Sequence, residues 1–361
     1  MEAALVVTPI ESHHSISVYL SSHGIHNLTE TAWCSMLVQA KDMIETAKKN
    51  GVIVRVAENF FRFPIDRFAQ KLKESGYIGS IDRIFCYNDH TGFHNNSRWI
   101  RFAGSHPLWV QSLQHTMKTG EFHSKPQRFH QDETFRANFF AFPHQLMVID
   151  QAANIKGFLG RQTRPGYTEW QGEYGTLVSP GMTSTTAPAA YYKDGTVTSR
   201  DRVPLVTQSE LRYCSPESFA KYGSSPDVIS EVVNEYEGHH WVRTYAETPK
   251  GVIEHRNPFR SDEPSKHRLK EYGACIMGHI VDFSLAVRGI AESEFDEHDA
   301  LMSMMMSIGA QESALREGQR IALPLSGDLE SEDRIRNRIK EKYGVDPLDV
   351  EGMLRISYPK P

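Results

Sequence analysis

Residues 52–84 divide the chain into two different architectures. Residues 52–56 form a short apolar run typical of a buried strand, and a helix follows that begins at Pro64, a residue well suited to the first helical position. Gly76 is expected to end this helix, and residues 80–87 are predicted to form the next strand. We expect the first strand to close one sheet and the second strand to open another.

The segment before this stretch alternates strands with helices. An apolar run at residues 3–7 ends at Thr8, as expected for a strand buried on both faces of a parallel sheet. The next elements are a helix over residues 12–23 that Gly24 ends, a strand over residues 26–29, and a helix that Ser35 caps and Gly51 stops. Strands joined by helical crossovers predict one half of a doubly wound α/β domain.

After residue 80 short strands replace the alternation of strands and helices. Predicted strands occupy residues 80–88, 176–179, 196–203, 241–247 and 251–255, and the last two form a hairpin. These strands predict an open, largely antiparallel sheet. No cap or periodicity defines an element between Asp89 and Glu133. Two helices come late in the chain, over residues 299–316 and 330–342, and in the second one Glu332 and Arg336 are spaced to pair.

Charge and composition exclude several classes of protein. A net charge of −5 argues against a nucleic-acid-binding protein, whose signature is a basic patch. No apolar run approaches the ~18 residues of a membrane span, and no secretory leader is seen, so we expect a cytosolic protein. The four cysteines contain no C-x-x-C pair, and the histidine pairs at residues 13–14 and 239–240 lack a further suitably spaced ligand, so no metal site is expected.

A set of spaced residues near the start of the chain matches a family pattern. It consists of Thr8, Pro9, His13, Gly24, His26, Glu30, Gly51, Glu58 and Arg62. The pattern is T-P-x-x-x-H, then G-K-H-V-x-x-E-K-P, a long helix, G-V, and E-x-x-x-R-x-x-P. On these residues the chain resembles the second half of the nucleotide-binding domain in the glucose-fructose oxidoreductase / inositol 2-dehydrogenase (Gfo/Idh/MocA) family. Residues 74–79 (ESGYIG) and 306–325 (MSIGAQESALREGQRIALPL) are similar to two later motifs of that family.

This resemblance implies a domain organisation and a function. It implies part of a Rossmann-like NAD(P)-binding domain at residues 1–64, a substrate and oligomerisation domain at residues 65–325, and a charged C-terminal helix and tail at residues 326–361. The implied activity is hydride transfer between NAD or NADP and a sugar, polyol or related hydroxylated small molecule, in a homo-oligomer formed through the open sheet. The cofactor would lie over Thr8, Pro9, His13, Glu30, Thr31 and Asn59.

Two departures from the family concern the cofactor. No G-x-G-x-x-G turn occurs in the chain, so roughly two strand–helix units of the family's nucleotide-binding domain have no counterpart. Thr31-Ala32 stands where the family usually has Lys-Pro. We therefore expect the chain alone to bind cofactor weakly or not at all. The open alternatives are a truncated dehydrogenase, a non-catalytic dimeric carbohydrate-binding or scaffold homologue, and a chain whose missing strands are supplied by a separate chain.

Residues 272–289 are the first candidate for the catalytic centre. The family carries D-x-G-x-H-x-x-D on a helix that ends at a glycine, and His279, Asp282 and Gly289 keep part of that spacing, although Cys275 and Met277 replace the first Asp and the Gly. Residues three apart lie on one helix face, and imidazole is the natural base for an alcohol proton near pH 7. The alternative is a structural histidine satisfied by a nearby carboxylate or backbone group.

Residues 139–157 are the second candidate, and we expect them to form a helix that lines the same cleft. Asp150 and Gly157 keep the interval of the family motif, but Met147 occupies the position of its histidine. His144 is the nearby imidazole, yet a separation of six residues would place His144 and Asp150 on different helix faces. This pair therefore ranks below His279 and Asp282.

Overall fold

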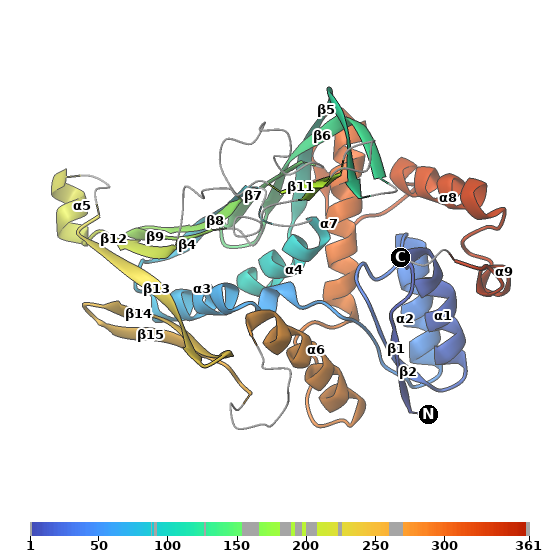
Figure 1. The fold of residues 1–361 in the computed structure, drawn as a ribbon, viewed down its shortest axis with the longest axis horizontal. Coiled ribbons are helices and arrows are strands. Elements are labelled where there is room, and N and C mark those ends of the chain that lie inside the picture. Colours follow the sequence, from blue (N-terminus) through green and yellow to red (C-terminus); the bar gives the residue numbers. More distant parts are fainter. Residues whose placement is uncertain are drawn as a thin grey trace.

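The computed structural model describes residues 2–87, 89, 92–125, 128–153, 166–180, 189–191, 197–199, 208–222, 226–259 and 270–358. These residues form a small parallel sheet and a large sheet with helices between them (Figure 1). The predicted fold class, a partial Rossmann-like unit followed by an open and largely antiparallel sheet, is confirmed.

The small sheet contains the N-terminal strands in the order β1-β2-β3, all parallel. Its elements are β1 (Ala3–Val6), α1 (Ile10–Ser22), β2 (His26–Thr29), α2 (Leu37–Lys49) and β3 (Val54–Val56). Gly24 and Gly51 follow the two helices with φ values of 73° and 64°, a backbone region that glycine enters without steric cost. The predicted alternation of strands and helices is therefore confirmed.

The expectation that the first strand is buried on both faces is wrong. Leu5 is 58% exposed, whereas its neighbour in the register, Leu28 of β2, is 2% exposed. Leu28 packs with Ala57 and with Phe283 of α6 (Glu271–Val287), so α6 covers this face of the sheet at its inner strands. Leu5 lies on the edge strand, which this helix does not protect.

The large sheet runs in the order β11-β10-β5-β6-β7-β4-β8-β9-β12-β13-β14-β15, and β16 pairs with β5. Its strands are antiparallel except for the parallel pair β4 and β7. They are β4 (Ile81–Tyr87), β5 (Trp109–Lys125), β6 (Arg128–Ala141), β7 (Met147–Ala153), β8 (Tyr167–Gly172), β9 (Gly175–Pro180), β10 (Ala189–Tyr191), β11 (Val197–Ser199), β12 (Ser209–Tyr213), β13 (Val228–Glu237), β14 (His240–Thr248), β15 (Gly251–Arg256) and β16 (Ile321–Ala322).

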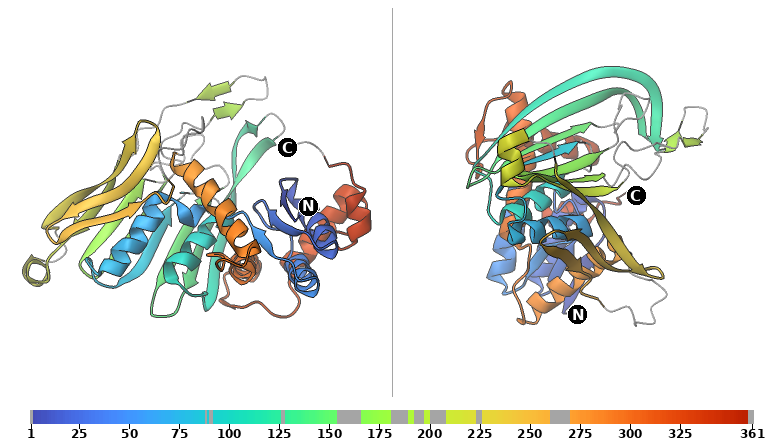
Figure 2. Two further views of the ribbon diagram at one scale, coloured as in Figure 1. Left: turned by 90° about the horizontal axis from the view of Figure 1, so that it is seen from below. Right: turned by 90° about the vertical axis from the view of Figure 1, so that its left-hand side faces the viewer.

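Helices connect the two sheets. The short helix η1 (Phe60–Arg62) and α3 (Pro64–Ser75) follow β3, and α3 buries Phe68, Ala69 and Leu72 completely, as predicted. Helix α7 (Glu297–Leu315) packs against β5 and α4 (Gly92–Ala103) on one side and against α2 and β3 on the other. In Figures 1 and 2 α7 lies between the small sheet and the large one, whereas α3 packs against β14 and β15 of the large sheet. A short helix, α5 (Pro216–Tyr222), follows β12.

Two stretches differ from the sequence-based expectation. The predicted helix over residues 139–157 is wrong: β6 ends at Ala141 and β7 begins at Met147, and burial alternates along β7 as a strand requires. Gly157 lies outside the described residues. The stretch from Asp89 to Glu133, which had no recognisable pattern, contains α4 and most of the β5–β6 hairpin. Helix α4 escaped detection because it buries four consecutive polar residues, Asn95 to Arg98, beside the apolar Trp99, Ile100 and Phe102, so its buried face is not marked by apolar residues alone.

The C-terminal segment packs on the small sheet's helices. It contains α8 (Glu330–Tyr343) and α9 (Val350–Leu354), and α9 contacts α1. The predicted pair of Glu332 and Arg336 is wrong. Glu332 accepts a hydrogen bond from the backbone of Leu37, and Arg336 pairs with Asp346 at 2.8 Å. The tail is therefore attached to the N-terminal unit.

Candidate functional site

The carboxyl ends of β1, β2 and β3 form one edge of the small sheet. Because the strands are parallel, Thr8 after β1, Thr31 after β2 and Asn59 after β3 come to this edge together, where doubly wound sheets bind ligands. Backbone hydrogen bonds from Glu30 to Val6 (2.8 Å) and from Ala57 to Thr29 (2.8 Å) hold the strand ends in register. The residues predicted to bind cofactor are thus gathered at one place.

His13 holds two loops of this edge together. Its ring is 1% exposed, with Nε2 at 2.7 Å from the carbonyl oxygen of Thr8 and Nδ1 at 3.0 Å from that of Ala32. Ser12 donates a hydrogen bond to the Thr8 hydroxyl at 2.8 Å. His13 therefore positions the loops after β1 and β2, and its ring nitrogens are engaged in doing so.

Glu58 and Asn59 bring polar atoms to the end of β3. The Glu58 side chain is buried, and its Oε1 accepts hydrogen bonds from the backbone N–H groups of Asn59 (3.1 Å) and Phe60 (3.2 Å). Asn59 Oδ1 is buried and has no hydrogen-bond partner within the part of the chain that is described. An unsatisfied buried acceptor suits the hydroxyl or amide donors of a ligand at this edge.

His94 at the start of α4 is the imidazole at this edge. Its Nδ1 lies 3.0 Å from Glu58 Oε1, and its ring packs against Phe60 at a centroid distance of 4.0 Å and against Phe93 at 4.1 Å. A carboxylate on Nδ1 fixes the tautomer in which Nδ1 carries the proton and Nε2 accepts one. The pair has the geometry of a base oriented by a buried carboxylate.

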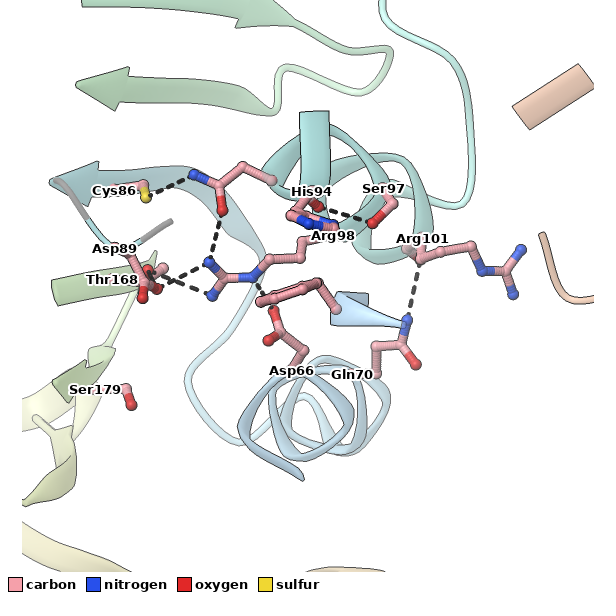
Figure 3. Close-up of polar contacts among 12 residues, drawn as sticks. Asp66, Gln70, Cys86, Asp89, His94, Ser97, Arg98, Arg101, Thr168 and Ser179 are labelled. Atoms are coloured by element: carbon pink, nitrogen blue, oxygen red, sulfur yellow. Dashed lines mark hydrogen bonds and ion pairs between the residues drawn. The ribbon is translucent and has the colours of Figure 1, made fainter. Parts of the chain in front are cut away.

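Arg98, one helical turn after His94, is the centre of a buried polar network (Figure 3). It is 3% exposed and pairs with Asp66 of α3 and with Asp89, each at 2.8 Å, while Thr168 of β8 donates to Asp89 at 2.6 Å. Burial would lower the pKa of Arg98, but Asp66 and Asp89 outweigh it and raise that pKa. Burial raises the pKa of Asp66 to about 6 against the effect of Arg98. The network ties α4 to α3, β4 and β8.

Asp150 also belongs to the surroundings of α4, whereas His144 does not. Asn95 donates a hydrogen bond to Asp150 Oδ2 at 3.1 Å, and burial raises the pKa of Asp150 to about 6. His144 is exposed in the turn between β6 and β7, with a φ of 59°. The structure therefore separates these two candidates, because β7 carries Asp150 inward from the turn.

The other predicted pair, His279 and Asp282, lies on α6. Asp282 is held by Arg62, with 3.1 Å between Nη2 and Oδ2, and it also accepts a hydrogen bond from the backbone of Glu294 at 3.0 Å. His279 is 9% exposed, and its Nδ1 is buried without a partner among the described residues. Burial and the nearby Arg62 lower the pKa of His279 to about 4. The carboxylate that the motif provides thus serves an arginine rather than the imidazole.

A cavity of about 260 Å³ opens between this edge and the large sheet. The loop after β2 contributes Ala32, Cys34 and Ser35, α4 contributes Phe93 and Asn96, and β6 contributes Arg136, Asn138 and Phe140. Helices α7 and α8 close the remaining side with Met304, Ser307, Ile308, Ala310, Gln311 and Ile335. The cavity therefore lies between the loop after β2 and the start of α4, where Phe93, the neighbour of His94 in the chain, forms part of its wall.

The sequence contained a signal for His94 that was not used. Gly92 and His94 keep the G-x-H spacing of the family motif, and Gly104 ends the helix with a φ of 69°. Ser97 stands where the motif has its second aspartate. The match was hidden because buried polar residues interrupt the apolar pattern of this helix, and Glu58, the partner of His94, lies 36 residues away in the sequence.

Within the described ranges, no group of three or more His, Cys, Asp or Glu side chains is placed to hold a metal ion. In the same part of the chain, no helix has the length and hydropathy needed to cross a membrane.

Comparison with known proteins identifies the fold. No protein-family model matches the chain, and no curated protein matches it in sequence. Among solved structures it is similar to a levoglucosan dehydrogenase in complex with NADH and levoglucosan, at 16% identity and a TM-score of 0.57, over 90% of this chain and 80% of that one. An oxidoreductase from Agrobacterium radiobacter, in complex with NAD+, L-tartaric acid and magnesium, gives 11% identity and a TM-score of 0.56 over 89% and 80% of the two chains.

A third neighbour is the aldose-aldose oxidoreductase from Caulobacter crescentus complexed with glycerol. It shows 13% identity and a TM-score of 0.55 over 90% of this chain and 79% of that one. The chain thus has the fold of Gfo/Idh/MocA-type oxidoreductases, in agreement with the resemblance found in the sequence.

Proposed function

We propose that this chain is an NAD(P)-dependent oxidoreductase of the Gfo/Idh/MocA type that acts on a sugar, polyol or related hydroxylated small molecule. The observation that carries the proposal is the His94–Glu58 pair at the carboxyl end of β3, next to a cavity between the small sheet and the large one. The neighbours of the same fold are described with NADH or NAD+ and with levoglucosan, glycerol or L-tartaric acid.

In this proposal His94 and Glu58 handle the proton of the substrate hydroxyl. Bound NAD(P)+ would supply the hydride acceptor at the edge formed by Thr8, Thr31 and Asn59. His94 takes the hydroxyl proton at Nε2 as the alcohol becomes a carbonyl, and the Glu58 carboxylate stabilises the resulting imidazolium. Phe60 and Phe93 pack against the ring and hold it in place.

His279 and Asp282 form the competing assignment for the proton-handling pair. Their setting favours a structural role, because Asp282 is bound to Arg62 and a base whose pKa is lowered to about 4 accepts a proton poorly at neutral pH. We propose that they help α6 to cover β2 and β3. His144, exposed in a turn, is assigned no role, and Asp150 supports α4 through Asn95.

The cofactor fit is incomplete on the phosphate side. The described edge offers Asn59 Oδ1 and the Thr8 hydroxyl to the ribose and nicotinamide, but the sequence contains no G-x-G-x-x-G turn for the pyrophosphate. A fluorescence titration with NADH and NADPH tests the proposal directly. Saturable binding of NADH or NADPH, weakened by the missing turn, followed by turnover of a sugar or polyol, is the expected result. Absence of binding up to millimolar cofactor would refute it in favour of a non-catalytic homologue.

We also propose that the chain forms a homo-oligomer through the large sheet. Leu113 of β5, Ile229 of β13 and Val252 of β15 are 55%, 59% and 55% exposed. Burial of such side chains against a second copy would be favourable. Light scattering of the full chain should give at least a dimer, and the substitutions Leu113→Asp and Ile229→Asp should shift it toward the monomer. A monomer at all concentrations would contradict this proposal.

A further inference from the structure

Arg136 is the cationic side chain of the cavity beside the cofactor edge. It lies on β6, and because side chains two apart share one face of a strand, Arg136, Asn138 and Phe140 all line the cavity. Phe140 forms the buried end of this row with 1% exposure, Asn138 follows with 8%, and Arg136 is half-buried at the outer end. The row runs from the apolar core to a positive charge.

Arg136 differs from the other enclosed arginines because it has no anionic partner. Its Nε donates a hydrogen bond to Gln114 of β5 at 2.8 Å, and no carboxylate of the described residues pairs with it. By contrast, Arg62 is bound by Asp282 and Glu294, and Arg98 by Asp66 and Asp89.

Enclosing a cation without a counter-ion is unfavourable. The pKa of Arg136 is accordingly lowered, and burial is the only cause of the change. Within the part of the chain that is described, carboxylates compensate the other enclosed arginines, and Arg136 is left uncompensated at the wall of a cavity. A ligand that carries the missing negative charge removes this cost when it binds.

The other polar groups of the cavity are neutral and suit hydroxyl groups. The Asn138 Oδ1 accepts a hydrogen bond from Ser112 at 2.7 Å, which fixes the amide, and no described residue accepts from its Nδ2. Ser307 and Gln311 of α7 line the opposite wall, and Asn96 donates to the Ser307 oxygen at 2.9 Å. The cavity therefore combines one cation with several neutral donors and acceptors.

We propose that Arg136 binds a carboxylate of the substrate, and that the substrate class is the sugar acids, with a carboxylate at one end and a row of hydroxyl groups along the chain. A guanidinium group binds a carboxylate through two parallel hydrogen bonds, and one edge of Arg136 remains available after its bond to Gln114. This inference rests on the proposed function, since it names the substrate of the same site.

The test compares two ligands that differ in the charged group. D-gluconate and sorbitol share a six-carbon polyhydroxylated skeleton, and only gluconate has a carboxylate. Isothermal titration of the full chain, with and without NADH, should show gluconate binding at least about tenfold more tightly than sorbitol, as expected for a charge-assisted pair. Arg136→Gln should abolish the preference, and Arg136→Lys should restore part of it.

Two controls separate this effect from unspecific attraction. Arg212→Gln removes a cation of the same sheet that pairs with Glu210 outside the cavity, and it should leave the preference unchanged. Inorganic phosphate at the same concentration should compete weakly, because it lacks the hydroxyl chain. Thermal unfolding of Arg136→Gln confirms that the variant is folded.

The outcomes distinguish this inference from the proposed function. Equal binding of gluconate and sorbitol, an unchanged preference in Arg136→Gln, full competition by phosphate, or no gluconate binding at all would each overturn the sugar-acid inference. None of these results affects the titration with NADH, which tests the proposed function. If NADH fails to bind while gluconate still binds through Arg136, the oxidoreductase proposal fails and the sugar-acid site stands.

Discussion

Two helices of this chain each carry a histidine near the small sheet, and they differ in what surrounds it. On α4, His94 lies against the buried carboxylate of Glu58. On α6, His279 has a buried Nδ1 without a partner among the described residues, and the carboxylate of Asp282 is taken by Arg62. The H-x-x-D spacing is better kept on α6, yet the arrangement of a base with its carboxylate is found on α4.

The difference shows why a sequence motif is insufficient to locate a base. Spacing within a helix places two side chains on the same face, but a base needs a partner that orients it, and this partner often comes from another element. Glu58 comes from the end of β3, whereas Arg62 of η1 removes Asp282 from any pairing with His279.

The strongest test of this comparison is the removal of each imidazole. His94→Ala should lower kcat by about 10²- to 10⁴-fold, the usual contribution of a general base, because no other group would take the hydroxyl proton. His279→Ala should change kcat by less than about threefold, since that residue lies outside the proposed proton path. Steady-state rates followed by NAD(P)H absorbance measure both. A larger loss of kcat in His279→Ala than in His94→Ala would assign the catalytic role to α6 instead.

The second test concerns the buried ion pairs that hold α4, with an exposed pair of α8 as the control. Arg98→Met should lower the free energy of unfolding by about 3–5 kcal/mol, because it leaves the buried carboxylates of Asp66 and Asp89 without their counter-ion. Arg334→Met breaks an exposed pair with Glu330 and should cost less than about 1 kcal/mol. Denaturant unfolding gives both values. Similar losses in the two variants would show that the ion pairs of Arg98 do not stabilise the fold more than an exposed pair does.

The third test uses the pH dependence of stability near α4. The pKa of Asp150 is raised to about 6 in the folded chain, against an ordinary value of 3.8, so the folded state binds the proton more tightly than the unfolded state. The stability that this group contributes is therefore present at low pH and is lost as pH rises from about 4 to about 6. Asp150→Asn keeps the oxygen that Asn95 needs. This variant should remove the loss in the free energy of unfolding between these pH values, which amounts to at most about 3 kcal/mol. An unchanged slope in the variant would contradict the assignment.

The fourth test uses the pH dependence of stability near α6, which has the opposite sign. Burial lowers the pKa of His279 to about 4 from 6.5, so the unfolded state binds the proton more tightly. Stability should therefore be lost as pH falls from about 6.5 to about 4, by at most about 3 kcal/mol. In His279→Phe the free energy of unfolding should no longer fall over this pH range. In His23→Phe, a change at an exposed histidine, the fall should remain. An equal loss of stability between about pH 6.5 and about pH 4 in the wild type and in His279→Phe would contradict the prediction.

Much of the fold follows from local patterns in the sequence. The short apolar strands, the glycines that end α1, α2 and α3, and Pro64 at the start of α3 each act through neighbouring residues, so their effect is visible in one dimension. The parallel order of β1, β2 and β3 then brings the predicted cofactor residues to one edge without any further information.

The tertiary structure decided the rest. Residues 139–141 and 147–153 are strands because they pair with β5 and β4, and α4 is a helix whose polar residues are satisfied only inside the fold, by Asp66, Asp89 and Asp150. Packing also assigned Asp282 to Arg62 and Glu58 to His94, because charges enclosed in a low-dielectric interior pair with whichever partner the packing places next to them. The sequence by itself thus determined where the strands end and where a cofactor could lie. Contacts between residues far apart in the chain set the partner of each buried charge, and these partners distinguish His94 from His279.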